Sequence, residues 1–145
     1  MQQVKNILQN KGSHYFFVSP NILVYEAMRV MGEKNISSVL VMENEVLMGI
    51  LTERDYARKV VLKGKFSATT FVHEIMTPHP GLTTVNPETT IEECMEIMTT
   101  QKIRHLPVLE EGRVAGIVSI GDVVYSIIRY QKDIIEDMTN YLYRR

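Results

Sequence analysis

The chain has 145 residues, of which 45% are hydrophobic and 23% are charged, a composition that is ordinary for a soluble globular protein. A formal net charge of −1 gives no reason to expect nucleic acid or an anionic membrane as a partner. No stretch has the length of a membrane span, the N-terminus lacks a secretory signal, and the one cysteine, Cys94, excludes an internal disulfide framework. We therefore expect a cytoplasmic protein.

Two segments of the chain repeat one another at a constant offset of 67 residues. Residues 18–57 align without a gap on residues 85–124, and eleven of the forty pairs are identical, among them Gly49 with Gly116 and Asp55 with Asp122. An ungapped match over forty positions indicates an internal duplication.

Each copy predicts the same elements in the same order, beginning with a strand and a helix. A β-prone run at residues 15–18, or 82–85 in the second copy, leads to Ser19-Pro20 or Asn86-Pro87. An N-cap residue before a proline predicts a helix start at both places. Apolar residues at helical spacing then predict one buried stripe on each helix. The stripes consist of Val24, Ala27, Met28 and Met31, and of Ile91, Cys94, Met95 and Met98.

A hairpin and a second helix complete each copy. Strands at residues 37–42 and 46–51 flank a polar turn, as do strands at residues 105–109 and 113–118. The second helices are expected to begin near Glu53 and near Ile120. The pattern of each copy is β-α-β-β-α, so the fold class that we expect is α+β.

One copy alone buries too little surface to fold stably, and one face of its sheet would be exposed to solvent. We therefore expect the two repeats to pack sheet to sheet with pseudo-twofold symmetry. The expected boundaries are residues 10–66 for the first repeat, 72–131 for the second and 132–145 for a C-terminal helical extension.

The extension carries an apolar stripe that needs a partner. Its residues run from Ile134 to Leu142. The partner is either the chain's own N-terminal segment, with Val4, Ile7 and Leu8, or a second subunit. We favour a homodimer, with both contacts compatible.

Both hairpins exit through the pattern Gly-hydrophobic-x-Thr/Ser-x-x-Asp, at residues 49–55 and 116–122. With the duplication, and with Glu74-Ile75-Met76-Thr77 ahead of the second copy, this pattern resembles the CBS-domain (cystathionine-β-synthase-type) family over roughly residues 5–130. The resemblance implies a regulatory module that catalyses nothing. Its paired repeats would form two clefts for AMP, ADP, ATP or another adenosyl ligand such as NAD.

The resemblance also implies which residues contact the nucleotide. The hydroxyl and the carboxylate of each motif would hold the ribose, strand backbone would bracket the adenine, and basic residues would meet the phosphates. The expected nucleotide-binding residues are Val18, Ser37, Ser38, Thr52, Arg54, Asp55, Thr84, Val85, Arg104, His105, Leu106, Pro107, Ser119 and Asp122.

A structural interpretation of the two motifs competes with this one. Ser/Thr-x-x-acid at a helix start resembles a capping box, with Asp in place of the usual Glu or Gln. The interpretations are compatible, because a helix N-terminus attracts phosphate and a carboxylate can accept bonds from ribose hydroxyls. Gly49 and Gly116 inside strands predict a bulge or the close approach of a ligand.

The two copies are chemically unequal. Arg104 and His105 correspond to the uncharged Ser37 and Ser38 in the first copy, while Arg54 corresponds to a glycine in the second. The two sites therefore either differ in affinity, or only one of them binds nucleotide.

Nothing in the sequence indicates an enzyme or a metal site. The histidines have no metal-ligand spacing, and no nucleophile–base pair or phosphate-binding glycine loop is found. Cys94 lies on an apolar stripe, which predicts a buried and inert thiol. Two other functions stay open: a structural interaction module without nucleotide, and a sensor of another adenosyl ligand such as S-adenosylmethionine.

Overall fold

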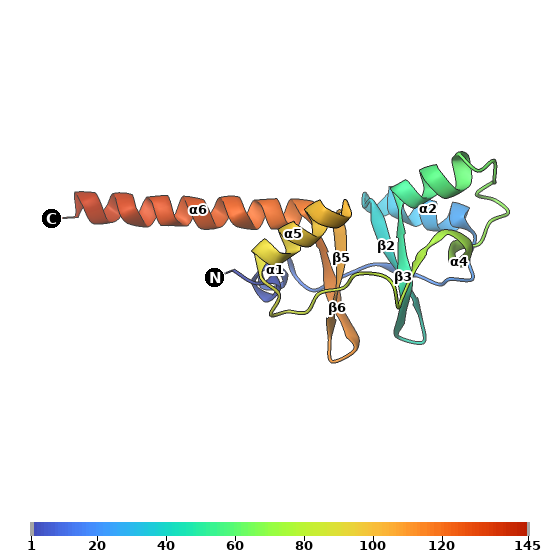
Figure 1. Ribbon diagram of the computed structural model, residues 1–145, viewed down its shortest axis with the longest axis horizontal. Coiled ribbons are helices and arrows are strands. Elements are labelled where there is room, and N and C mark those ends of the chain that lie inside the picture. Colours follow the sequence, from blue (N-terminus) through green and yellow to red (C-terminus); the bar gives the residue numbers. More distant parts are fainter. Residues whose placement is uncertain (1, 145) are drawn as a thin grey trace. The chain divides into compact units, whose positions relative to one another are not determined.

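The structure is a computed structural model that describes residues 2–144. Along the chain it has α1 (Val4–Lys11), β1 (Phe17–Val18), α2 (Val24–Lys34), β2 (Ser38–Glu43), β3 (Val46–Thr52), α3 (Glu53–Tyr56), the π-helical turn η1 (Ala57–Val61), α4 (Val72–Ile75), β4 (Thr77–Pro78), α5 (Ile91–Gln101), β5 (His105–Glu110), β6 (Arg113–Ser119) and α6 (Ile120–Tyr143) (Figure 1). The α+β class and both hairpins are confirmed.

One compact unit is built on the first repeat and consists mainly of His14–Thr83. Its sheet has the order β1-β2-β3-β4, with β1 parallel to β2 and the other neighbours antiparallel. The predicted stripe of α2 is confirmed, since Val24, Ala27 and Met31 are buried in the core of this unit. We call it the first unit.

The other compact unit, the second unit, joins the N-terminal residues up to Ser13 to the second repeat. β5 and β6 form its hairpin, and the stripe of α5, with Ile91, Cys94 and Met98, lies in its core. Here the expected strand at residues 82–85 shrinks to one bridge, Val85 beside Val108, at the positions equivalent to Val18 and Val41. Pro107 lacks the amide hydrogen with which Leu40, its equivalent, extends the ladder in the first unit, where the Leu40 amide donates to the Phe16 carbonyl.

Each unit contains the segment that precedes the other repeat in the sequence. α1 comes before the first repeat but packs in the core of the second unit through Val4, while α4 comes before the second repeat and packs in the first unit through Val72. The backbone contacts correspond as well: the Val4 amide donates to the Thr89 carbonyl at 2.8 Å, and the Val72 amide to the Ile22 carbonyl at 3.0 Å. The duplication therefore extends further upstream than the forty aligned pairs.

The two strand glycines make room for these exchanged segments. A Cβ atom at Gly49 would collide with the carbonyl oxygen of Thr77 in β4, and one at Gly116 would lie 2.9 Å from the Cδ2 atom of Leu8 in α1. A register shift between β2 and β3 lies beside Gly49. A bulge and a close approach thus both occur at Gly49, and in each unit the approaching group belongs to the chain itself.

The predicted starts of α2 and α5 at Pro20 and Pro87 are wrong, because both helices begin four residues later. Side chains that precede the prolines cap turns instead: Ser19 Oγ accepts the Asn21 amide hydrogen at 3.1 Å, and Asn86 Oδ1 accepts that of Glu88 at 2.9 Å. Such side-chain-to-backbone bonds compete with helix formation.

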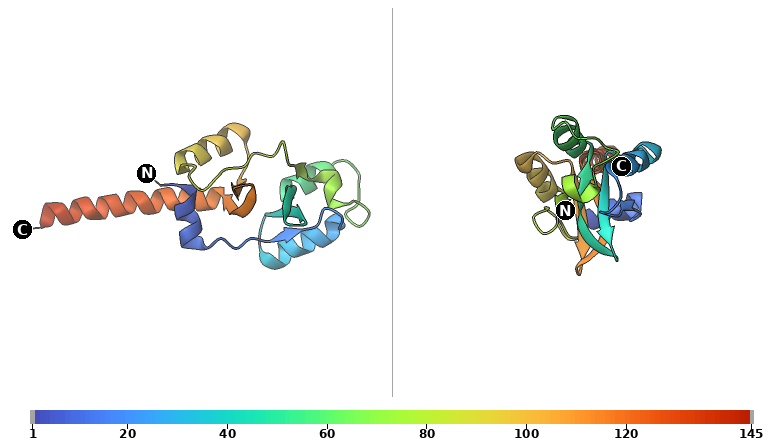
Figure 2. Two further views of the ribbon diagram at one scale, coloured as in Figure 1. Left: turned by 90° about the horizontal axis from the view of Figure 1, so that it is seen from below. Right: turned by 90° about the vertical axis from the view of Figure 1, so that its right-hand side faces the viewer.

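The last helix, α6, has 24 residues and extends beyond α1 and α5, the other helices of its unit, as two perpendicular views show (Figures 1 and 2). Its first turns pack in the core through Val123 and Ile127, beside Val4 and Ile7 of α1. Every described residue from Ile128 onward is exposed. The alternative that the stripe at residues 134–142 packs on the N-terminal segment is therefore wrong. None of the helices within residues 2–144 is long and apolar enough to cross a membrane.

Candidate functional site

The first motif forms the start of α3. Thr52 is the N-cap, its Oγ1 accepts the Asp55 amide hydrogen at 3.1 Å, and Asp55 Oδ2 accepts the Thr52 amide hydrogen at 3.0 Å. Lys59 approaches from one turn further on, with its Nζ atom 3.0 Å from Asp55 Oδ1 and 3.0 Å from the Ile75 carbonyl oxygen. Asp55 is buried, so its carboxylate is held by a capping box and an adjacent cation.

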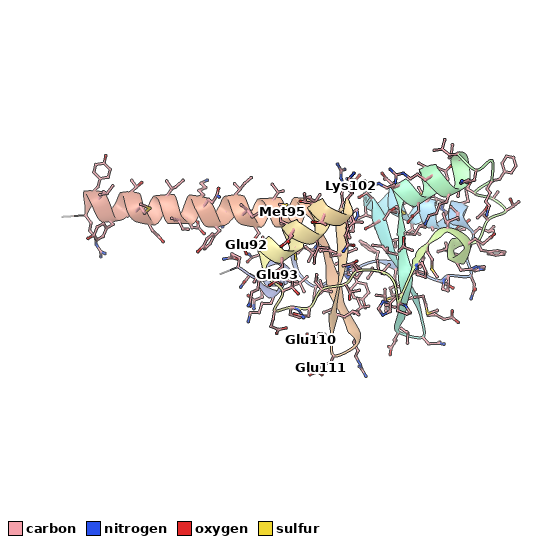
Figure 3. All side chains as sticks on the ribbon, viewed as in Figure 1. Glu92, Glu93, Met95, Lys102, Glu110 and Glu111 are labelled. Atoms are coloured by element: carbon pink, nitrogen blue, oxygen red, sulfur yellow. The ribbon has the colours of Figure 1, made fainter. Side chains whose placement is uncertain are left out.

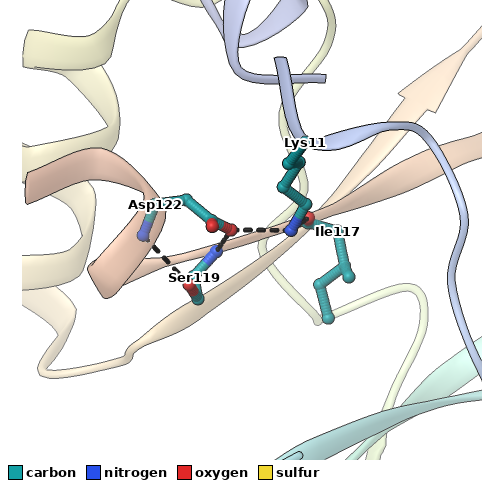
Figure 4. A network of polar contacts seen from close by, with 4 residues as sticks. All are labelled: Lys11, Ile117, Ser119 and Asp122. Carbon is teal, nitrogen blue, oxygen red and sulfur yellow. Dashed lines mark hydrogen bonds and ion pairs between the residues drawn. The ribbon is translucent and has the colours of Figure 1, made fainter. Parts of the chain in front are cut away.

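The second motif forms the start of α6 in the same way (Figure 4). Ser119 Oγ accepts the Asp122 amide hydrogen at 3.1 Å, and Asp122 Oδ2 accepts the Ser119 amide hydrogen at 2.9 Å. The cation here is Lys11 from α1, whose Nζ atom donates to Asp122 Oδ2 at 2.7 Å and to the Ile117 carbonyl at 2.9 Å. Both motifs are therefore reciprocal capping boxes, as the structural interpretation predicts.

The electrostatic surroundings of Asp122 favour its charged form. Partial burial alone would raise the pKa of this carboxyl group, but the hydrogen bonds from Lys11 and the Ser119 amide, with the charge of Lys11, outweigh that effect. The net result is a pKa below the ordinary value. Asp122 is thus a charged acceptor that already has a cation beside it.

Two of the expected residues use their backbone to support the helix starts. The Ser37 carbonyl accepts the amide hydrogen of Glu53 at 3.1 Å, and the Arg104 carbonyl accepts that of Ile120 at 2.8 Å. These pairs occupy equivalent positions in the two repeats. The residue just before β2 or β5 therefore accepts a hydrogen bond from the first residue of the motif helix in its unit.

The expected residues separate into two groups, each within one unit. The first unit contains Val18, Ser37, Ser38, Thr52, Arg54 and Asp55, and the second contains Thr84, Val85, Arg104, His105, Leu106, Pro107, Ser119 and Asp122. The buried members are Val18, Ser38, Asp55, Val85, Leu106 and Pro107, the exposed members are Ser37, Arg54 and Arg104, and the rest are half-buried. The three cationic or imidazole side chains are thus at least partly accessible to solvent.

A hollow of about 320 Å³ opens beside Asp122 in the second unit, between α1 and α6. It is lined by Gln2, Ile7, Asn10, Lys11, Asp122, Tyr125, Ser126, Arg129, Tyr130 and Asp133. The Arg129 guanidinium donates to Tyr125 Oη at 3.3 Å. Lys11 and Arg129 place two cations near the motif carboxylate, and their positions were not predicted from the sequence.

The sequence contained a signal for one of the two partner lysines only. Lys59 stands four residues after Asp55, a spacing at which opposite charges meet on a helix. Lys11 stands 111 residues before Asp122, and no local pattern connects them. Both lysines were missed.

Other chemically reactive groups have structural surroundings. Cys94 is fully buried in the core of the second unit, and burial, with the nearby charge of Glu93, raises the pKa of its thiol to about 11. The prediction of an inert thiol is confirmed, because the reactive thiolate is disfavoured. Within residues 2–144, no three His, Cys, Asp or Glu side chains lie together in a way that could hold a metal ion.

Comparison with known proteins agrees with the repeat structure. The CBS domain family matches the chain twice, at residues 4–62 and 72–129. The CBS domain-containing protein CBSX3, mitochondrial, of Arabidopsis thaliana is 34% identical over 146 residues, which cover 96% of this chain and 71% of the relative.

Solved structures show the same fold. A putative signal-transduction protein with CBS domains from Burkholderia ambifaria superposes with a TM-score of 0.84 at 44% identity, covering 88% of this chain and 95% of that one. The structure of CBSX2 in complex with AMP gives a TM-score of 0.73 at 23% identity, covering 90% and 99%, and is a likeness of fold. By its two matched domains and its close relatives, the chain belongs to the CBS domain family.

Proposed function

We propose that this chain is a regulatory module that binds an adenine nucleotide, AMP, ADP, ATP or NAD, and signals through its conformation or a partner protein. The observation that carries the proposal is the pairing of a hydroxyl and a carboxylate at a helix start, once in each repeat of a CBS-domain chain. A fold relative, CBSX2, has been solved in complex with AMP. No catalytic step is proposed.

The proposed roles follow from the chemistry of each group. Asp122 and Asp55 would accept hydrogen bonds from the two ribose hydroxyls, since a carboxylate can serve adjacent donors. Ser119 and Thr52 would contribute their hydroxyls at the same points. Phosphates would meet Arg104 and His105 of the second unit, or Arg54 of the first.

Lys11 adds a specific feature to the second site. Its Nζ atom contacts Asp122 and the Ile117 carbonyl. A ribose that hydrogen-bonds to Asp122 must therefore displace this cation from the carboxylate. Once released, Lys11 would be free to pair with a phosphate. This exchange favours a phosphorylated ligand over adenosine.

The test is a thermal-unfolding screen with AMP, ADP, ATP, NAD and S-adenosylmethionine. A ligand that binds only the folded state adds about 2.7 kcal/mol at about 100 times its Kd, which raises the midpoint by roughly 5–10 °C for a chain of this size. A flat response to every adenine nucleotide by a folded sample would leave the structural module as the function. A response to S-adenosylmethionine alone would select the other adenosyl sensor.

Titration with two ligands tests the phosphate contacts. Arg104→Ala should weaken binding of AMP or ATP strongly and binding of adenosine little, because the guanidinium is proposed to contact phosphate alone. Equal weakening of both ligands would contradict that role.

We further propose that the protein acts as a homodimer in the cytoplasm. The exposed apolar residues of α6 support self-association, and the chain's net charge of −1 gives no support for nucleic acid or membrane as partners. The regulated protein is not identified by these features.

A further inference from the structure

The outer part of α6, residues 130–143, has a surface that its own unit leaves uncovered. The family match ends at residue 129, whereas the helix continues to Tyr143. Figure 3 shows side chains projecting from this outer part with no other element of the unit against them. An amphipathic helix gains most of its stability from packing of its apolar face. We therefore expect the apolar face of this outer part to pack against a partner.

The exposed apolar face follows a regular heptad. We call one row of this face the seam: Val124, Ile128, Gln131, Ile135, Met138 and Leu142, which are spaced alternately by four and three residues, with Ile134 and Tyr141 exposed beside them. Its five apolar members are 40–70% exposed. Alternating spacing of this kind is the seam of a coiled coil, in which each side chain inserts between four residues of a facing helix.

The seam residues of the first turns of α6 are not the ones that its own unit covers. Ile120, Val123 and Ile127 of α6 pack on the core, and Asp122, Ser126 and Arg129 line the hollow beside α1. Val124 and Ile128 lie on the remaining side and stay exposed. The seam is therefore open to a second helix from Ile128 to Leu142, where every residue is exposed.

The charges beside the seam favour a protein helix over a lipid surface. The polar side of the outer helix carries Arg129 and Lys132 against Asp133, Glu136 and Asp137, so it has no excess of cations for anionic headgroups. In a symmetric pair each seam meets the same seam, which makes a second copy of this chain the partner that fits by construction.

Gln131 indicates the direction of the pair. In a parallel pair it faces Gln131 of the other copy, and the two amides can hydrogen-bond to each other. In an antiparallel pair centred on the seam it faces Ile135, which leaves a buried amide without a partner. Isoleucine at the alternate positions, Ile128 and Ile135, also suits a parallel two-stranded coil.

We propose that two copies of this chain associate through a parallel coiled coil of α6, with Gln131 paired across the seam. The proposal specifies the interface of the homodimer included in the proposed function. It does not depend on nucleotide binding.

Cysteine cross-linking tests the direction of the pair. Because Cys94 is fully buried, an introduced cysteine supplies the one accessible thiol within residues 2–144. Gln131→Cys and Met138→Cys should each form a disulfide-linked dimer under mild oxidation. Asn140→Cys, on the outer side of the same helix, is the matched control and should cross-link at least tenfold less. Equal cross-linking at all three positions, or none at the seam positions, would overturn the parallel coil.

Mass in solution tests the interface. The native chain should have twice its 16.7 kDa mass by light scattering, and Ile135→Glu with Met138→Glu should give a monomer. Asp137→Ser with Asn140→Ser, on the polar side, should stay dimeric. A monomeric native chain, or a dimer that survives both glutamates, would refute the interface. Nucleotide titration of the same variants separates this outcome from failure of the proposed function.

Discussion

The two motif carboxylates have the same capping geometry but obtain their cations from different parts of the chain. Asp55 pairs with Lys59 at 3.0 Å, one turn along the same helical run. Asp122 pairs with Lys11 at 2.7 Å, across to α1. In the first unit the ion pair is local, whereas in the second it connects the N-terminal helix to the start of α6. A ligand that displaces the lysine would therefore loosen α1 in the second unit, whereas in the first unit it would release the hydrogen bond from Lys59 to the Ile75 carbonyl of α4.

The largest expected loss of stability comes from a side chain added at the glycine that begins the first motif. Gly49→Ala should lower the free energy of unfolding by about 1–3 kcal/mol, because its Cβ would meet a backbone oxygen that cannot move aside. Gly121→Ala in the second motif is the matched control. Its Cβ would lie 3.6 Å from Ser119 Oγ, an ordinary contact, and alanine favours the helix by up to about 1 kcal/mol. Urea unfolding of both variants measures the difference. An unchanged free energy of unfolding for Gly49→Ala would show that the Thr77 carbonyl can move aside.

Removing the N-cap hydroxyls tests whether the two capping boxes are equivalent. Thr52→Ala and Ser119→Ala should each cost about 1 kcal/mol, the usual value for a lost helix N-cap. Chemical denaturation of the two variants should give similar losses. A loss confined to one variant would show that only that hydroxyl contributes to folding.

The duplication explains how much of this could be predicted. Hairpins, helix stripes and both capping boxes follow from short patterns that the two copies repeat, so each copy confirms the other. The exchange of α1 and α4 could not be predicted from those patterns, because Val4 and Val72 lie outside the forty aligned positions. The pairing of the sheets, the domain boundaries and the nucleotide contacts stay predictions.

Lys11 provides a smaller effect with a defined pH dependence. Lys11→Met should cost up to about 1 kcal/mol at neutral pH, since the pair is partly exposed. The folded-state pKa of Asp122 is lowered, so its contribution is complete above the unfolded value of about 3.9 and disappears as the pH falls through the folded value. The difference between native chain and variant should therefore shrink below about pH 4 in unfolding experiments. A difference that stays constant down to pH 2 would mean that the ion pair is not its source.

The local pair gives a loss of similar size. Lys59→Met should cost up to about 1 kcal/mol, because Asp55 is buried while Lys59 is partly exposed. Hydrogen exchange distinguishes the two lysines better than stability does. Lys11→Met should increase amide exchange in α1, whereas Lys59→Met should leave α1 unchanged. Equal amide exchange of α1 in both variants would show that the Lys11–Asp122 pair does not hold α1 in place.

Calorimetric titration with AMP tests the central claim that the motifs bind nucleotide as well as cap helices. Asp122→Asn keeps the shape of the side chain and should weaken binding by about 1.5–3 kcal/mol, roughly 10- to 150-fold, with a much smaller change in the ligand-free melting point. Asp55→Asn tests the first site in the same way. If the folded native chain binds no adenine nucleotide, or if both variants bind AMP as the native chain does, the two motifs are helix caps and the claim is wrong.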